Sequence, residues 1–163
     1  MRDLRTLIDD TEVTLAFYGS IVYLALVSAL GAQANPPSPA AAISGVIATA
    51  SVLYIAHVFA ALVPKAARKG QLHRSDLAAS LAHDVPLLLS VIVPVIPLLL
   101  ASWEVIEVDT GYRLAVRLTI ALLFGLAVTL SRRDGLSWRR ALYAGLVIIA
   151  IAIAVIWLES HVH

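Results

Sequence analysis

The stretch YIAHVFAALVPKAARKGQLHRSDLAASLAHDVP, residues 54–86, decides how the chain is organised. It contains the end of one apolar run, a short basic segment and the start of a second apolar run. The basic segment carries Lys65, Arg68 and Lys69. Charged side chains of this kind are far more costly inside a lipid bilayer than the apolar runs on either side. The pattern predicts two membrane-spanning helices joined by a loop on one side of a membrane.

The composition of the whole chain also indicates a membrane protein. The 163 residues are 60% hydrophobic and 14% charged, with a mean hydropathy of +0.88. Soluble domains carry about a quarter charged residues. The net charge of +1 gives no sign of a nucleic-acid partner, and we expect none. The absence of cysteine excludes disulfides, thiol redox chemistry and cysteine-ligated metal sites.

Five apolar blocks predict five transmembrane helices. Each block approaches the length of about 20 residues that a helix needs to cross the hydrocarbon core. The expected spans are residues 13–32, 40–63, 81–102, 112–131 and 141–158. The predicted fold is therefore all-α, a single domain over residues 1–163, built as an integral membrane bundle.

The distribution of Lys and Arg predicts the orientation of this bundle. These residues occur in the N-terminal segment, in residues 64–80 and in residues 132–140. Residues 33–39 contain none, and residues 103–111 contain only acidic charges. The positive-inside rule therefore predicts a cytoplasmic N-terminus and a C-terminus outside, in a multi-pass protein of a bacterial-type inner membrane.

Ionisable and polar side chains of three expected spans fall near the cytoplasmic side. The set is Glu12, Tyr54, His57, His83 and Asp84. His57 lies about 10 Å inside the expected cytoplasmic edge, where its side chain needs a partner or a wet cavity. We expect these groups to converge in the inner third of the membrane. They would serve either as a proton or ion pathway or as a hydrogen-bonded contact that holds helices together.

The spacing of these residues does not favour a metal or a cofactor. No HxxxH or HxxE pattern occurs on one helix, and such spacing is typical of metal ligands. A haem held by two histidines would need His57 and a facing partner, and His83 lies too near the interface for that role. We therefore expect no metal site, no cofactor and no catalytic residues.

Prolines give the third expected span an unusual character. The residues that share one helical face follow one another in steps of three and four: His83, Pro86, Ser90, Pro94 and Pro97. Each interior proline removes a backbone donor, and Pro94 leaves the carbonyl of Ser90 without its usual partner. We predict a kinked helix whose free carbonyls are met by neighbouring groups or by water.

Two motifs in spans two and three carry a family resemblance. Ala56-His57-Val-Phe-Ala60 is followed, after the basic loop, by Asp84-Val-Pro86. In these features the chain resembles a loose group of small, uncharacterised bacterial integral membrane proteins. That group more often has Glu-Trp-Pro where this chain has Asp84-Val85-Pro86. The resemblance implies no activity, and it directs attention to His57 and Asp84.

These observations favour a binding or conducting role over catalysis. No nucleophile paired with a base, phosphate-binding loop or metal motif occurs in the sequence. We expect a small proton or cation pathway, formed by a homo-oligomer because five short helices enclose little polar volume. The alternative is a non-enzymatic accessory subunit that packs against a larger membrane complex. In both cases the lipid bilayer is the surrounding partner.

Overall fold

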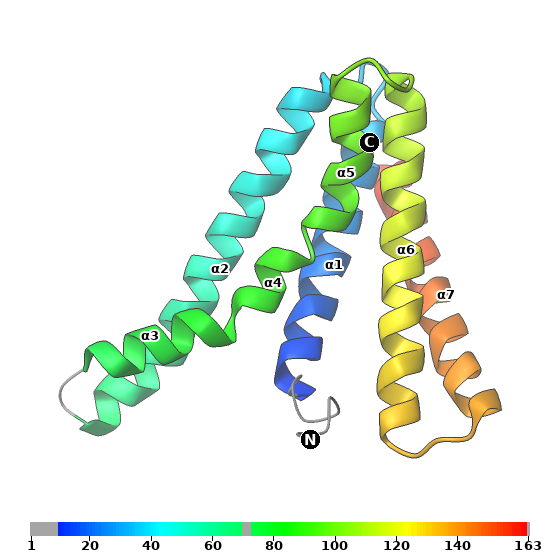
Figure 1. Ribbon diagram of the computed structural model, residues 1–163. Helices are drawn as coiled ribbons and strands as arrows, with labels where there is room; N and C mark the ends of the chain where they lie inside the picture. The colour runs from blue at the N-terminus through cyan, green and yellow to red at the C-terminus, as the bar shows by residue number, and fades with distance from the viewer. Residues whose placement is uncertain (1–9, 70–72, 163) are drawn as a thin grey trace.

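The computed structural model describes residues 10–69 and 73–162, and the regular secondary structure within these ranges is entirely helical (Figure 1). The helices are α1 (Asp10–Gly31), α2 (Pro39–Lys69), α3 (Arg74–His83), α4 (Val85–Leu89), α5 (Ile92–Ser102), α6 (Val108–Arg133) and α7 (Trp138–Val162). Three of the described helices, α1, α2 and α6, are long and apolar enough to cross a membrane. The prediction of an all-α fold is therefore confirmed, and the three helices fit the prediction of a membrane protein.

Helix α1 forms the centre of the bundle and contacts α2, α4, α5, α6 and α7. One buried cluster joins it to α2, α5 and α6 through Tyr23, Val46, Leu98 and Tyr112. At the end of the bundle that lies uppermost in Figure 1, the Tyr112 hydroxyl donates a hydrogen bond of 2.9 Å to the Pro37 carbonyl. This contact fixes the α1–α2 connection against the first turns of α6.

Helix α2 continues beyond the end that the sequence predicts. The expected span ends at residue 63, but α2 passes through Pro64 and ends at Lys69. Its 31 residues correspond to about 46 Å, which exceeds the hydrocarbon thickness of a bilayer. Pro64 removes only one backbone donor, and the alanines that follow favour helix. The loop expected to begin at residue 64 is therefore wrong over residues 64–69.

The region expected to form the third span is divided among three helices. Helix α3 begins at Arg74, where the Asp76 carboxylate accepts a hydrogen bond of 3.3 Å from the His73 backbone N–H. A break at Asp84 separates α3 from α4, and a second break at Ser90 and Val91 separates α4 from α5. The segment bends by 50° between Arg74–Leu89 and Ile92–Ser102.

The prolines lie beside these breaks. Pro86 lies in the first turn of α4, while Pro94 lies in the first turn of α5 and Pro97 inside it. The second break falls at Ser90, whose carbonyl would have bonded to the missing N–H of Pro94. With that donor absent, the chain turns at Ser90–Val91 and α5 begins as a new helix. The bent pair α3–α4 and α5 is a fourth candidate span.

Candidate functional site

The break between α4 and α5 leaves the Leu87 backbone carbonyl without its usual helical donor, and two hydroxyl groups donate hydrogen bonds to it instead. In a continuous helix the Val91 N–H would donate to the Leu87 carbonyl, but here it donates to Leu88 at 3.2 Å. The Leu87 carbonyl instead accepts from Ser90 Oγ at 2.7 Å and from the Tyr23 hydroxyl of α1 at 3.2 Å. The break is thus a formed element of the fold, held from α1.

A single buried face runs through α3, α4 and α5 despite the two breaks. Its members follow one another in steps of three and four, as on one helix. They are Ser80, Asp84, Leu87, Ser90, Pro94 and Pro97. Polar side chains at three of these positions face the interior of the bundle, so this face is the polar stripe of the molecule.

Asp84 is the ionisable member of the polar stripe. It lies between α3 and α4, and only 4% of its surface is exposed. Its backbone N–H donates to the Ser80 carbonyl at 3.3 Å, and its carbonyl accepts from the Leu87 N–H at 3.2 Å. Its side-chain oxygen Oδ2 is buried and has no hydrogen-bond partner among the described residues. An interior oxygen without a partner is energetically costly, which makes this carboxyl conspicuous within the polar stripe.

A lysine approaches the polar stripe one turn before Asp84. Lys65 Nζ donates a hydrogen bond of 2.9 Å to Ser80 Oγ. Since Ser80 precedes Asp84 by four residues, the ammonium group and the carboxyl lie near the same helical face. Lys65 can reach this position because α2 continues past Pro64. The sequence pattern predicts that the helix ends before Pro64, so it does not predict this contact.

The structure places His57 against Tyr18 of α1. The centroids of the two rings are 5.6 Å apart, and their planes are inclined by 46°. His57 is half-buried and faces α1, but among the described residues it makes no hydrogen bond with Asp84 or Tyr54. The Tyr54 hydroxyl donates instead to the Leu81 carbonyl of α3 at 2.8 Å.

The structure therefore brings the predicted residues together only in part. Asp84 and Tyr54 both lie at the α2–α3–α4 junction, and His57 lies on the α1 side of α2. The side chains of Glu12 and His83 are outside the described residues. Within the described part, no group of three or more metal-ligating side chains could hold a metal ion.

Tyr18, Tyr23, Ser80 and Lys65 were not identified as site residues from the sequence. Their positions follow from how α1, α2 and α3 pack on one another, and a helical repeat gives no information on the register between two helices. The spacing of Ser80, Asp84 and Ser90 by four and six positions, which places them on one helical face, was the signal that could have found the stripe.

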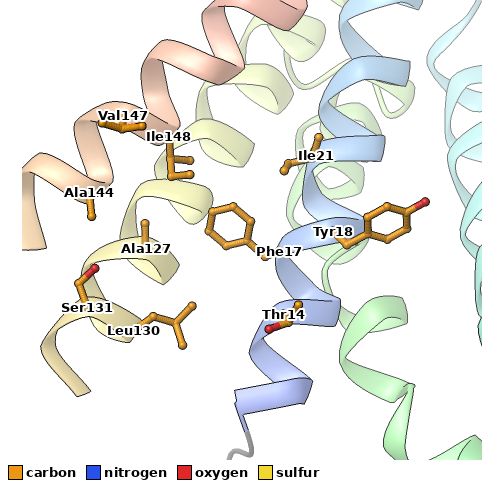
Figure 2. Close-up of a pocket in the computed structure, with 10 residues that line it drawn as sticks. All are labelled: Thr14, Phe17, Tyr18, Ile21, Ala127, Leu130, Ser131, Ala144, Val147 and Ile148. Atoms are coloured by element: carbon orange, nitrogen blue, oxygen red, sulfur yellow. The ribbon is translucent and has the colours of Figure 1, made fainter. Parts of the chain in front are cut away.

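A separate groove lies on another side of α1. It is bounded by α1, α6 and α7 and has a volume of about 600 Å³. Figure 2 shows Phe17 of α1 directed toward α6 and α7. Tyr18, whose ring contacts His57, also lines the groove. No residue of the polar stripe lines it, so the groove is distinct from the stripe. No protein-family model, curated protein or solved structure matches the chain.

Proposed function

We propose that the chain is an inner-membrane protein with five transmembrane segments, a cytoplasmic N-terminus and an outer C-terminus. In this proposal α1, α2, α6 and α7 each cross the membrane, and α4 with α5 forms the broken third segment. The positions of the basic residues support it. Lys65, Arg68 and the loop of residues 132–140 lie at the same end of the bundle as the start of α1 (Figure 1).

The proposed function is a proton or cation pathway in which the carboxyl of Asp84 is the binding group. The supporting observation is that Asp84 Oδ2 is buried at a helix break without a hydrogen-bond partner among the described residues. An ionisable side chain inside a membrane bundle indicates a functional site. Broken helices provide ion-binding positions in membrane transporters because they expose polar backbone groups inside the protein.

The neighbouring groups would give such a pathway direction. Ser80 and Ser90 precede and follow Asp84 on the polar stripe, and Lys65 contacts Ser80 at the basic end. His57 lies on α2, which contacts both α3 and α4. An imidazole can accept and release a proton at physiological pH, so His57 is proposed as a second relay group.

The pathway is proposed to form in a homo-oligomer. Only 17% of the membrane-crossing stretch of α2 is buried within the chain, so most of its surface is open to another copy or to lipid. Among the residues whose burial is described, one copy buries only six polar or charged side chains, and a continuous wet path needs polar surface on more than one side. Copies packed on the open face of α2 would supply it.

Proton flux into liposomes tests this function. Purified protein is reconstituted with a pH-sensitive dye inside, and an imposed potassium gradient with valinomycin drives proton entry. The wild-type chain should acidify the lumen faster than protein-free vesicles do. Asp84→Asn should abolish the difference, because an amide keeps the size of the carboxyl but cannot titrate. His57→Gln should reduce the flux and its dependence on pH.

The matched control is Asp134→Asn, which removes a carboxylate from the exposed α6–α7 loop. It should leave the flux unchanged. A monodisperse gel-filtration profile must accompany each variant, so that lost flux is separated from lost folding. A folded Asp84→Asn variant with wild-type proton and cation flux would refute the role of Asp84.

A second candidate function is favoured by the same open face of α2. Apolar residues such as Ile47, Val52, Ile55 and Phe59 are exposed along it. An accessory subunit would use such a face to pack against a larger membrane complex. Size analysis in mild detergent separates the two functions, since a discrete homo-oligomer is expected of the pathway and a lone monomer of the accessory subunit.

A further inference from the structure

The groove between α1, α6 and α7 has a definite origin in helix packing. The three helices pack closely around Leu24, Leu123 and Ala152. They separate toward the end where α1 begins, and the gap is lined by apolar side chains including Phe17, Leu130 and Val147 (Figure 2). The resulting groove of about 600 Å³ is open and apolar along its length.

The α6–α7 loop, which follows the groove-lining residue Ser131, is strongly basic. The loop of residues 132–140 carries Arg132, Arg133, Arg139 and Arg140 against one acid, Asp134. Arg140 precedes Ala144 by four residues, and Ala144 lines the groove. The two side chains therefore share a face of α7, which directs Arg140 toward the groove. Arg139 and Arg140 are both exposed.

Three of the loop arginines, Arg132, Arg139 and Arg140, differ in the contacts that they make. The Arg132 guanidinium donates a hydrogen bond of 3.0 Å to the Leu136 carbonyl and lies 5.7 Å from the centre of the Trp138 ring. These contacts stabilise the loop itself. Arg139 and Arg140 make no hydrogen bond or ion pair with the described residues. Thr14 and Ser131 add two hydroxyl-bearing side chains to the lining of the groove.

We propose that this groove binds an anionic phospholipid, with one acyl chain between α1 and the α6–α7 pair and the phosphate at Arg139 and Arg140. The ligand must be apolar along most of its length and negatively charged at one end. A phospholipid of the leaflet that faces the basic loops has this chemistry. Guanidinium groups bind phosphate oxygens through paired hydrogen bonds. Two arginines also favour a headgroup with a net negative charge over a zwitterionic headgroup, whose net charge is zero.

The size of the groove favours an acyl chain over a protein helix. The wall formed by α1 extends from Thr14 to Ile21, which is about 10 Å along the helix axis. A transmembrane helix of a second copy would need a contact surface closer to the bilayer thickness of about 30 Å. An acyl chain is narrow and flexible, so a short, open groove can hold part of it.

Lipid-dependent thermal stability in detergent tests the proposal. The probes are dioleoyl phosphatidylglycerol and dioleoyl phosphatidylcholine, added at equal concentrations to the delipidated full-length chain. The anionic lipid should raise the unfolding temperature at a lower concentration than the zwitterionic lipid. In Arg139→Gln/Arg140→Gln the apparent affinity for phosphatidylglycerol should fall about tenfold or more, while that for phosphatidylcholine stays unchanged.

The matched control removes two arginines from the other basic segment. Arg68→Gln/Arg74→Gln changes the net charge by the same amount, far from the groove, and should keep the preference for phosphatidylglycerol. Ala144→Phe fills the groove and should weaken binding of both lipids. Glycerophosphoglycerol, which lacks acyl chains, should not compete, because the groove holds the chain.

Three outcomes would overturn the site. The first is equal stabilisation of the wild-type chain by both lipids. The second is equal loss of preference in the control and in the Arg139/Arg140 variant, which would mean non-specific attraction to the basic end. The third is a change of oligomeric state in Ala144→Phe with unaltered lipid binding, which would assign the groove to a second copy.

Discussion

Two glycines on neighbouring helices differ in what surrounds them. A Cβ added to Gly19 of α1 would lie 2.7 Å from Ser90 Oγ and 3.3 Å from the Leu87 carbonyl oxygen. A Cβ added to Gly45 of α2 would meet nothing within 4 Å. Gly19 therefore permits the close approach of α1 to the break that carries the polar stripe, whereas Gly45 has no such role inside one chain.

We predict that Gly19→Ala destabilises the folded chain and Gly45→Ala does not. The first change should cost about 1–3 kcal/mol, because the added methyl group meets a hydrogen-bonded hydroxyl and a backbone oxygen. The second should be neutral or stabilising by up to about 1 kcal/mol, since alanine favours helix. Thermal unfolding in detergent measures both. Equal effects at the two positions would contradict the packing of α1 on α4.

The choice of Asp84 as a residue of interest could be made from the sequence, but its neighbours could not. A carboxyl inside an apolar run is conspicuous in any membrane sequence. Whether His57 meets Asp84, Tyr54 or Tyr18 depends on the rotation and register of α1 against α2. Apolar surface all around a membrane helix leaves that rotation without a periodic signal, so the Tyr18–His57 contact emerges only from the fold.

At the scale of elements, the sequence predicts the long helices and the kink of the proline-rich segment, but not the division of that segment into three helices. The apolar runs predict α1, α6 and α7 to within a few residues, because the length of a span is set by the membrane thickness. Pro64 lies inside α2, whereas Pro94 lies beside a break. The two prolines differ in their surroundings. At the break before Pro94 the hydroxyls of Tyr23 and Ser90 donate to the Leu87 carbonyl, and the sequence does not show which groups provide this support.

The two hydroxyls that meet the Leu87 carbonyl should act as a unit. Tyr23→Phe or Ser90→Ala alone leaves the carbonyl with one donor, and each should cost about 0.5–1.5 kcal/mol. Removing both leaves an interior carbonyl without a partner, which adds about 1–3 kcal/mol. The double variant should therefore be less stable than the sum of the single variants predicts. A double-mutant cycle from unfolding in detergent measures this coupling.

The control for this cycle is Tyr112→Phe combined with Ser90→Ala. Tyr112 also donates its hydroxyl to a carbonyl, that of Pro37, but at the far end of the bundle. Because the two sites share no partner, their effects should add to within about 0.5 kcal/mol. Additive behaviour of the Tyr23 and Ser90 changes as well would mean that the Leu87 carbonyl finds another donor, and that the break is not held from α1.

At the scale of the whole molecule, the two ends of the bundle differ both in the chain segments that they contain and in their charge. The start of α1, the end of α2 and the α6–α7 loop lie together, and the α1–α2 and α5–α6 connections lie at the opposite end (Figure 1). Basic residues are concentrated at the first end, while acidic residues occur in the α5–α6 connection. The polar stripe begins at the basic end, where Lys65 contacts Ser80, so orientation decides which compartment supplies the proposed ion.

Because the chain has no cysteine, single introduced thiols can determine this orientation without background. Asn35→Cys and Val105→Cys, both at exposed positions, should react with a membrane-impermeant maleimide in intact bacterial cells. Ser75→Cys and Ser137→Cys should react only after the membrane is permeabilised. Labelling of Ser137→Cys in intact cells would reverse the orientation, and labelling of both groups would mean that the chain inserts in two directions.

A thiol at the C-terminus determines the number of crossings. With a cytoplasmic start, an odd number of segments places the two ends of the chain on opposite sides of the membrane, and an even number places them on the same side. His163 itself lies outside the described residues. If α4 with α5 crosses as one broken segment and α7 also crosses, His163→Cys should label from outside, together with Asn35→Cys. Protection of His163→Cys, with Asn35→Cys labelled and Ser137→Cys protected, would mean that α7 does not cross. The groove would then lack one of its walls within the bilayer, and the lipid site would lose its geometric basis, whereas the Asp84 pathway through α1 to α5 would remain.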